Sequence, residues 1–315
     1  MSESIVIVGA ARTPMGSFQG DFSSLSAHDL GGAAIKAAVE RAGIDPAVVG
    51  EVLFGNCLMA GQGQAPARQA AYKGGLPDAA GAVTLSKMCG SAMKAAMLSH
   101  DLLLAGTHDV IVAGGMESMT NAPYLMLKGR GGETVISIDE GPGKVKLDKI
   151  PTLKPAFKKD GGTITAASSS SINDGAAALV MTTASQAQKL GAKPIARIVG
   201  HATHAQQPEW FSTAPVGAVA KLFKKIGWSV KDVDLWEVNE AFAVVPMALM
   251  KELGVAHDIV NVHGGACALG HPIGASGARI MVTLMYALKA RGLTKGLATL
   301  CIGGGEATAV ALELL

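Results

Sequence analysis

Two stretches of this sequence follow the same order of small-residue turn, helix, glycine, strand and paired glycines. The first covers residues 89–115 and the second covers residues 274–305, and a glutamate follows each of them closely. An apolar run at residues 307–314 comes directly after the second stretch, whereas its counterpart in the first half, residues 176–181, comes much later. The chain is therefore predicted to fold as two similar halves, with an insertion between two adjacent strands of the first half.

Apolar runs of strand length alternate with helical periodicity in both halves. Strands are predicted at residues 5–8, 52–54, 83–85, 110–113, 176–181, 233–238, 259–262 and 307–314, with another that ends in Cys301. Helices are predicted at residues 25–42, 91–104, 216–226, 241–253 and 276–290. This alternation favours an α/β fold in which helices cover mostly parallel sheets.

The insertion in the first half begins near residue 120 and ends near residue 164. It is rich in Gly, Pro and Lys, and its strand signal at residues 133–138 is weak. A segment of this length without a core pattern is uncommon in a compact domain. We expect an N-terminal half made of residues 1–120 and 165–190, a short insertion at residues 121–164, and a C-terminal half at residues 191–315.

Composition and charge exclude several classes of protein. Apolar residues make up 49% of the 315 residues and charged residues 17%, so the chain can bury a large core and disorder is excluded as its main state. A net charge of +2 gives no electrostatic basis for binding nucleic acid. No run of about 18 apolar residues predicts a membrane span, and no leader pattern opens the chain, so we expect a cytoplasmic protein without a membrane partner.

The four cysteines are expected to be thiols rather than disulfides or metal ligands. Without a leader peptide, a disulfide framework is not expected. No Cys-x-x-Cys pair occurs, and His201-x-x-His204 alone makes a poor metal site, so no metal is predicted. Cys57 and Cys267 lie among small residues and are interpreted as packing residues.

Cys89 lies where a predicted strand ends and a predicted helix begins, in the turn Cys89-Gly90-Ser91. Free backbone N–H groups and the positive end of the helix dipole favour a thiolate at such a position, and a thiolate is a strong nucleophile. A buried structural cysteine is the alternative interpretation. Local context alone leaves both open.

Cys301 ends a predicted strand and is followed by Ile302 and three glycines. Glycines at such a place let the backbone pass close to a ligand and present N–H groups to an oxyanion, with Gly303 the first of them. A tight packing turn is the alternative.

His271 lies in a glycine-dense loop, and Asn239 opens a helix after a strand. The loop holds one imidazole on a rigid backbone just before a helix, although a phosphate-binding loop with an incidental histidine is an alternative. Asn239 could be an ordinary helix cap. It could also be a polar donor at the carboxyl end of a strand, where α/β proteins gather their sites.

These four stretches, in this order, resemble the thiolase family. The matching segments are Cys89-Gly90-Ser91, Asn239-Glu240-Ala241-Phe242, Gly270-His271-Pro272 and Cys301-Ile302-Gly303, together with residues 8–14 and 173–177. The resemblance covers nearly the whole chain. It implies a thiolase-like α/β fold of two similar halves, with mixed sheets and with helices between and outside them.

The resemblance also implies a mechanism. His271 would take the proton of Cys89, whose thiolate would attack an acyl-CoA thioester, and Cys301 would take the α-proton of a second acetyl-CoA. The N–H groups of Cys89 and Gly303 would form one oxyanion site, and His271 with a water held by Asn239 would form the other. The reference pKa of each thiol is near 8.5, so modest shifts would bring it close to neutral. The substrates would be coenzyme A thioesters, with no metal or redox cofactor.

The chain departs from the family in its insertion. Thiolases carry a larger loop domain here that covers the active site, helps to bind coenzyme A and in many members joins dimers into tetramers. On the order of 70–80 residues are missing between Lys128 and Gly132, which is a large gap beside ordinary loop lengths. We therefore expect a homodimer rather than a tetramer. By the resemblance, Arg130, Ser170, Ala241 and Phe242 would contact coenzyme A.

Two other functions stay open at this point. A condensing enzyme of the ketoacyl synthase type shares the fold, but such enzymes typically use Cys-His-His or Cys-His-Asn, whereas this chain places Cys301 last. A folded scaffold that has lost its cover, with little or no activity, is the second alternative.

Overall fold

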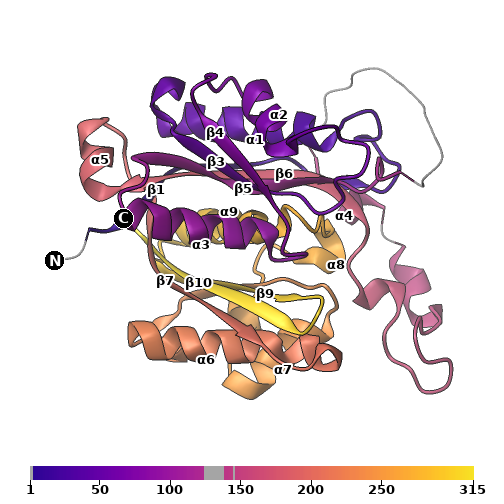
Figure 1. Ribbon diagram of the computed structural model, residues 1–315. Helices are drawn as coiled ribbons and strands as arrows, with labels where there is room; N and C mark the ends of the chain where they lie inside the picture. The colour runs from indigo at the N-terminus through magenta and orange to yellow at the C-terminus, as the bar shows by residue number, and fades with distance from the viewer. Residues whose placement is uncertain (1–2, 124–137, 145) are drawn as a thin grey trace.

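Helices and sheets alternate in five layers in the computed structural model, which describes residues 3–123, 138–144 and 146–315 (Figure 1). Helices α1 (Ala27–Ala42) and α2 (Pro66–Lys73) cover the outer face of the first sheet. Helices α3 (Ser91–Leu104) and α9 (Ser276–Arg291) lie between the two sheets, and α6 (Ala214–Ile226) with α7 (Val244–Leu253) covers the outer face of the second. The predicted placement of helices between and outside two sheets is confirmed.

The strands form one continuous hydrogen-bonded order, β4-β3-β5-β6-β1-β7-β10-β9-β8, with β2 paired to β6. The two sheets meet at β1 and β7, which pair only at Val6↔Arg197 and Ile7↔Ala196. The strands are β1 (Ile5–Arg12), β2 (Gly16–Ser17), β3 (Glu51–Gly55), β4 (Gly81–Leu85), β5 (Val110–Ser118), β6 (Asn173–Thr183), β7 (Ala196–Ala205), β8 (Leu235–Val238), β9 (Lys295–Ile302) and β10 (Glu306–Leu314).

The internal repeat of the sequence is visible in the pairing of the strands. β5 pairs antiparallel with β6, for example at Val112↔Val180, and β9 pairs antiparallel with β10 at Thr299↔Ala309. The insertion of the first half therefore leaves from the end of one strand and returns to the strand beside it, as predicted.

The sheets are mixed, so the expectation of mostly parallel sheets is wrong. Only β3–β4, β3–β5 and β8–β9 are parallel among the described pairs, and the other pairs are antiparallel. The reason is that β9 and β10 follow each other through a tight turn. A parallel neighbour would need a crossover connection of a dozen or more residues.

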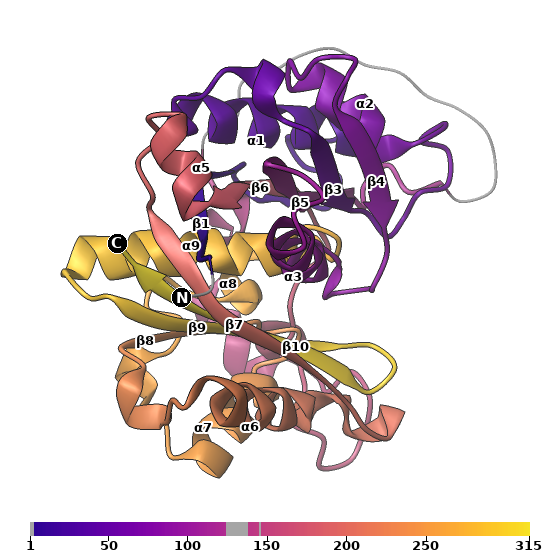
Figure 2. The ribbon, with the colours of Figure 1, turned by 60° about the vertical axis from the view of Figure 1, so that its left-hand side comes forward.

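The two middle helices, α3 and α9, are buried because each of them packs against a sheet on both sides. Figure 2 shows α3 almost end-on between the two sheets. Strand β1 illustrates the layering: Ile5 and Ile7 point into the space that holds α3 and α9, whereas Val6 and Val8 point toward α1. A Cβ on Gly277 would lie 2.4 Å from the backbone nitrogen of Met93, so α9 can cross α3 this closely only with glycine there.

Several predicted elements need correction. The predicted strand at residues 259–262 is wrong: a 3₁₀ turn occupies His257–Ile259, and only Val260 bridges to Trp236. Asn261 ends any strand because its φ is +49° and its side chain bonds both backbone groups of Val238. Strand β7 was not predicted because polar residues, including His201 and His204, interrupt its apolar pattern. The predicted helix at 241–253 begins at Val244, and α2 and α5 (Ala184–Lys189) were also missed.

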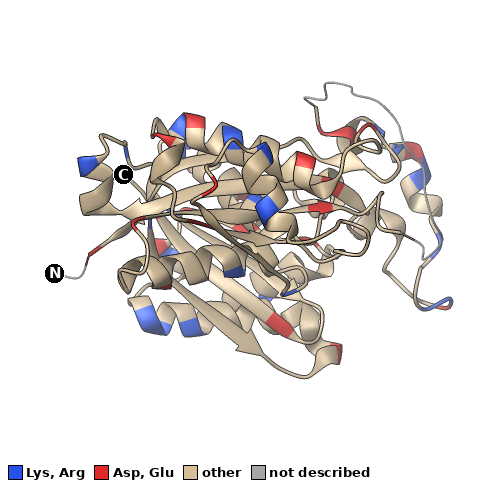
Figure 3. Ribbon diagram, turned by 45° about the horizontal axis from the view of Figure 1, so that its top comes forward, with Lys and Arg blue, Asp and Glu red and all other residues tan. Residues whose placement is uncertain are grey.

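The shortened insertion is attached to the first half by two carboxylates. Among its described residues it holds only α4 (Glu140–Gly143) and a 3₁₀ turn at Leu147–Thr152, and most of the weak strand signal at 133–138 lies outside the described residues. Asp139 accepts hydrogen bonds of 3.0 Å from both terminal nitrogens of Arg12, and Glu140 accepts one of 2.9 Å from Ser17 N–H. Figure 3 shows that Lys and Arg gather on this segment and on the outer helices, while the strands carry few charges.

None of the described helices is both long enough and apolar enough to cross a lipid bilayer.

Candidate active site

Cys89 stands in a strained turn between β4 and α3. Ser91 fixes this turn: its hydroxyl accepts a 2.8 Å hydrogen bond from Lys87 N–H and donates one of 2.7 Å to the Met88 carbonyl. Met88 has a φ of +45°, which a residue with a side chain rarely adopts. A Cβ on Gly90 would lie 2.4 Å from Ile302 Cδ1, so the glycine allows the Cys89 turn to pack against the end of β9.

Strand β9 brings Cys301 and Gly303 to the same place. Burial raises the pKa of Cys89 above its ordinary value, although the nearby backbone groups of Gly303 and of Cys89 itself work against this rise. Burial, together with the neighbouring Cys89, raises the pKa of Cys301 to about 12. Both thiols are therefore protonated at neutral pH in the free protein. The expectation that modest shifts bring them close to neutral is wrong, because desolvation outweighs the helix start.

His271 is held as a neutral base with a defined tautomer. Its Nδ1 lies 2.6 Å from Ser276 Oγ, and the Ser276 hydroxyl donates a 3.0 Å hydrogen bond to the Pro272 carbonyl. Because the single hydroxyl proton is used there, we assign the imidazole proton to Nδ1, which leaves Nε2 with a free lone pair. Burial, helped by the charge of Arg279, lowers the pKa of His271 to about 3. The ring is therefore neutral at neutral pH, and its Nε2 lone pair carries no proton.

A buried ion pair orients Asn239 toward that nitrogen. The Arg279 guanidinium lies 3.4 Å from Glu237 Oε2 and donates a hydrogen bond of 3.4 Å to Asn239 Oδ1. With its oxygen engaged, the Asn239 amide presents Nδ2 to His271 Nε2 at 3.5 Å. Arg279 and Ser276 are site residues that sequence reasoning missed. Both follow His271 on the first turns of α9, a position that could have suggested a supporting role.

Glu117 is another missed residue, and it holds the loops of the site together. Its side chain is buried, and its carboxylate accepts hydrogen bonds from the backbone of Cys57 at 3.0 Å, Leu58 at 3.0 Å and Gly274 at 2.9 Å. Burial raises the pKa of Glu117. The signal for it was present in the sequence, because Glu117 and Glu306 follow the paired glycines of the two repeats.

The serine run at residues 168–171 lies beside the segment after β8. Ser170 donates hydrogen bonds of 3.0 Å from both its N–H and its hydroxyl to the Ala241 carbonyl, and Ser169 bridges to Phe242. The His271 N–H donates a 3.2 Å hydrogen bond to the Ser171 carbonyl. The structure thus brings Ser170, Ala241 and Phe242 next to the His271 loop. Arg130, the fourth residue expected to contact coenzyme A, lies outside the described residues.

The other two cysteines, Cys57 and Cys267, are also free thiols. Cys57 Sγ lies 3.3 Å from Ser91 Oγ, so it packs against the Cys89 turn. Burial, with the nearby Glu117 for Cys57 and Glu240 for Cys267, raises the pKa of each to about 12. Their interpretation as packing residues stays a prediction.

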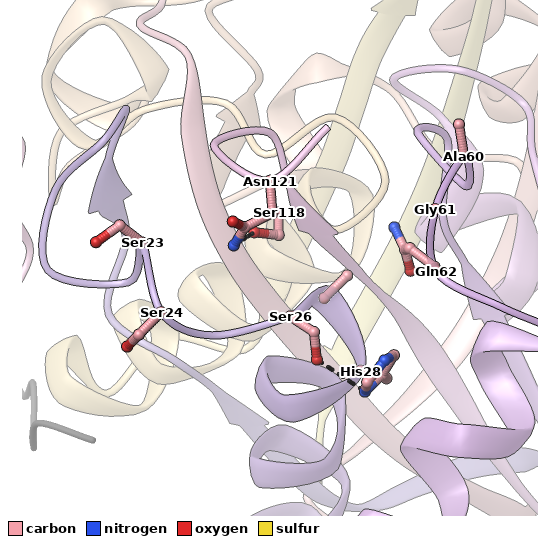
Figure 4. Close-up of a pocket in the computed structure, with 10 residues that line it drawn as sticks. Ser23, Ser24, Ser26, His28, Ala60, Gly61, Gln62, Ser118 and Asn121 are labelled. Carbon is pink, nitrogen blue, oxygen red and sulfur yellow. Dashed lines mark hydrogen bonds between the residues drawn. The ribbon is translucent and has the colours of Figure 1, made fainter. Parts of the chain in front are cut away.

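Two hollows lie near these residues. A cavity of about 740 Å³ runs along the insertion, with Lys144, Lys146 and Lys149 on one side and Ala166, Ala167 and Cys267 on the other. A second, of about 620 Å³, is lined by serines, His28 and Asn121, and Figure 4 shows the 2.8 Å hydrogen bond between Ser26 and His28 at its wall. No predicted site residue lines this second cavity.

The sequence matches two families that cover most of its length. Residues 5–128 and 124–185 match "Thiolase, N-terminal domain", and residues 192–314 match "Thiolase, C-terminal domain". The N-terminal match is in two pieces that overlap at residues 124–128, beside the place where the insertion is short.

Named relatives and solved structures agree with these matches. The chain is 40% identical to acetyl-CoA acetyltransferase 2 of Arabidopsis thaliana over 391 residues, covering 99% of this chain and 97% of that protein. It is 40% identical to mitochondrial acetyl-CoA acetyltransferase of Mus musculus, covering 99% of this chain and 91% of that one. The Ascaris suum Acat5 thiolase, solved with coenzyme A, superposes with a TM-score of 0.93 at 36% identity over 99% of this chain and 100% of its own. The predicted cytoplasmic location stays a prediction.

The alignment with the Arabidopsis thaliana protein shows how many residues this chain lacks. The alignment covers 391 positions, whereas the chain has only 315 residues. The difference between these two numbers is 76, so at least 76 aligned positions have no residue in this chain.

Proposed function

Because the chain belongs to the thiolase family, we propose that it transfers acyl groups between coenzyme A thioesters with Cys89 as the nucleophile. The proposed reaction condenses two acetyl-CoA molecules to acetoacetyl-CoA, or runs in reverse as thiolysis. One observation carries the proposal: the backbone groups of Gly303 and Cys89 lie close enough to the Cys89 sulfur to act against the rise in its pKa. In the proposal, the N–H groups of Cys89 and Gly303 stabilise the oxyanion that forms when the sulfur attacks the thioester carbonyl carbon.

Acylation needs a base for a thiol that is protonated at rest. In the proposed step, His271 Nε2 takes the Cys89 proton as the sulfur bonds to the thioester carbon. The tetrahedral oxyanion is stabilised by the Cys89 and Gly303 N–H groups. When it collapses, coenzyme A leaves as a thiolate and takes the proton of Cys301, so that acetyl-Cys89, the Cys301 thiolate and protonated His271 remain.

The step that forms the carbon–carbon bond then returns Cys89, His271 and Cys301 to their starting protonation states. The Cys301 thiolate takes an α-proton from the second acetyl-CoA, and the resulting carbanion attacks the carbonyl carbon of acetyl-Cys89. The enolate oxygen would be stabilised by protonated His271 and by a water held by Asn239. The freed Cys89 thiolate recovers its proton from His271. No metal or redox cofactor takes part in this proposal, since coenzyme A thioesters are the only reactants.

Coenzyme A binding is proposed along the serine run and the insertion. Ser170, Ala241 and Phe242 would border the pantetheine arm, and Arg130 would meet the nucleotide end. One cavity is lined by Lys144, Lys146 and Lys149. It is also lined by Ala166 and Ala167, which come just before the serine run. Three lysines suit the phosphates of coenzyme A.

A folded scaffold with little or no activity is the second candidate function, and the missing 76 positions or more favour it. An assay of acetoacetyl-CoA cleavage by coenzyme A separates the two candidates. The proposed enzyme consumes acetoacetyl-CoA and releases two acetyl-CoA. A scaffold leaves acetoacetyl-CoA unchanged, as the His271→Ala variant should.

A further inference from the structure

A cluster of two histidines and an aspartate joins α3 to β7, on the part of α3 far from Cys89. Asp101 Oδ1 lies 3.0 Å from His100 Nδ1 and 3.0 Å from His201 Nε2. One ligand atom from each of the three residues lies within 4.8 Å of the others. The two imidazole rings meet edge to face, with centroids 5.0 Å apart.

We propose that His100, Asp101 and His201 bind a divalent transition-metal ion of the zinc class. The proposal does not depend on the proposed function, because none of these residues takes part in it.

The donor set suits such an ion. Two imidazole nitrogens and one carboxylate oxygen are ordinary ligands of Zn²⁺, and three protein ligands leave a position for water. With ligands about 2.0–2.1 Å from Zn²⁺, the edge of a tetrahedral site is roughly 3.3 Å. The two 3.0 Å contacts to Asp101 are only a few tenths of an ångström shorter. The third edge, between the two imidazole nitrogens, is at most 4.8 Å, so an ion would draw the imidazoles together by at most about 1.5 Å.

The charges around the cluster also favour a cation. Burial acts to raise the pKa of Asp101, but the hydrogen bonds from His100 and His201 outweigh it, so the pKa lies below its ordinary value. Burial lowers the pKa of His201, against the pull of Asp101, so this ring is neutral at neutral pH. Lys225 acts against a bound cation, because its Nζ donates a 3.4 Å hydrogen bond to the His201 carbonyl.

The cluster is open to an arriving ion on one side only. The Asp101 side chain is 53% exposed, whereas the side chains of His100 and His201 are 13% and 10% exposed. The carboxylate therefore faces solvent, and the imidazoles are fixed by packing.

A bound ion would tie the two halves of the molecule together. His100 and Asp101 belong to the first half, and His201 belongs to the second, whose sheet joins the first at only two register pairs. The sequence hides the site because its ligands are 100 residues apart. His204, the partner that spacing suggests for His201, points instead toward Gly217 on α6 and contacts Gln206 Oε1 at 3.0 Å.

Zinc binding to the full-length, chelator-treated protein tests the proposal. We expect calorimetric titration with ZnCl₂ to give one site, and Co²⁺ to give the visible spectrum of a nitrogen–oxygen site without a sulfur charge-transfer band. His100→Gln, Asp101→Asn and His201→Gln should each weaken binding by more than the roughly 10–100-fold that loss of an outer-shell partner costs. Zn²⁺ in excess should raise the unfolding temperature by a few degrees in the parent protein but not in these three variants.

His108→Gln is the matched control. His108 also pairs with a carboxylate, Glu51, at 2.9 Å, but among the described residues it belongs to no group of three possible metal ligands. This variant should bind Zn²⁺ like the parent. The proposal is overturned if the parent binds no Zn²⁺, or if binding survives in Asp101→Asn and His201→Gln. It is also overturned if Co²⁺ shows sulfur ligation that alkylation of the thiols removes. Asp101→Asn is an exposed, isosteric change, so a folded variant is available even if His201→Gln is unstable.

Discussion

Cys89 and Cys301 are both thiols, yet the proposed reaction gives them different work. We expect Cys301→Ser to block formation of acetoacetyl-CoA far more than acylation of Cys89. A hydroxyl is a much poorer base than a thiolate, so the carbon–carbon step loses its base, whereas acylation keeps His271 as its base and loses only the proton that Cys301 gives to the leaving coenzyme A thiolate. Rapid-quench measurement of acyl-enzyme, beside steady-state acetoacetyl-CoA turnover, separates the two steps. Equal loss of both in a folded variant would contradict separate roles.

The environment of His271 predicts an unusual pH profile for acylation. Its pKa is lowered to about 3, far below the ordinary 6.5, because the ring is buried beside Arg279. His271 should therefore stay neutral and able to accept the Cys89 proton between pH 5 and 7. We expect the single-turnover acylation rate to show no loss centred near pH 6.5. A loss centred there would mean that the ring titrates like an exposed histidine.

The lowered pKa of His271 also makes the free energy of unfolding depend on pH. Unfolded His271 takes a proton near its ordinary pKa, whereas the folded residue does so only near pH 3. Between these values the unfolded state binds more protons, so this group lowers the free energy of unfolding as pH falls from 6.5 toward 3. His271→Asn should show a weaker loss of stability over that window in chemical denaturation.

At the scale of elements, the crossing of α3 and α9 depends on one glycine. Gly277→Ala would place a methyl group 2.4 Å from the Met93 backbone nitrogen, which cannot move without shifting α3. We expect a loss of about 1–3 kcal/mol in the free energy of unfolding, as overpacking typically costs. The control is Gly143→Ala, since a Cβ there meets nothing within 4 Å. Similar melting temperatures for the two variants would contradict this packing account.

The elements that the sequence predicted well are those with a strong local pattern. Helix α3 was predicted with its observed bounds, and α1 ends at Gly43 because that glycine adopts φ +66°. Strand β7 was not predicted because its polar residues break the apolar pattern, and the partner of His201 is Asp101 on the distant helix α3. The roles of Cys89, His271 and Gly303 come from the family resemblance and stay predictions, and no local sequence pattern indicated the contacts of Arg279 and Glu117.

At the scale of the whole molecule, the short insertion should affect function more than folding. It joins β5 to β6, which are neighbours, so a short connection costs little closure entropy. The missing cover would have excluded water and held the pantetheine arm, which positions the thioester. We expect a homodimer with weak coenzyme A binding, measured by light scattering and calorimetric titration. A tetramer that binds coenzyme A as tightly as a full-length relative would contradict this.

The site of acetylation tests the central claim most directly. The protein is mixed with isotopically labelled acetyl-CoA, quenched in acid and mapped by peptide mass spectrometry, with Cys89→Ala and Cys57→Ala as parallel samples. We predict labelled acetyl on Cys89 in the parent and in Cys57→Ala, and none in a folded Cys89→Ala variant. Label on Cys57 or Cys267, or no acetylated cysteine in the parent, would contradict Cys89 as the nucleophile.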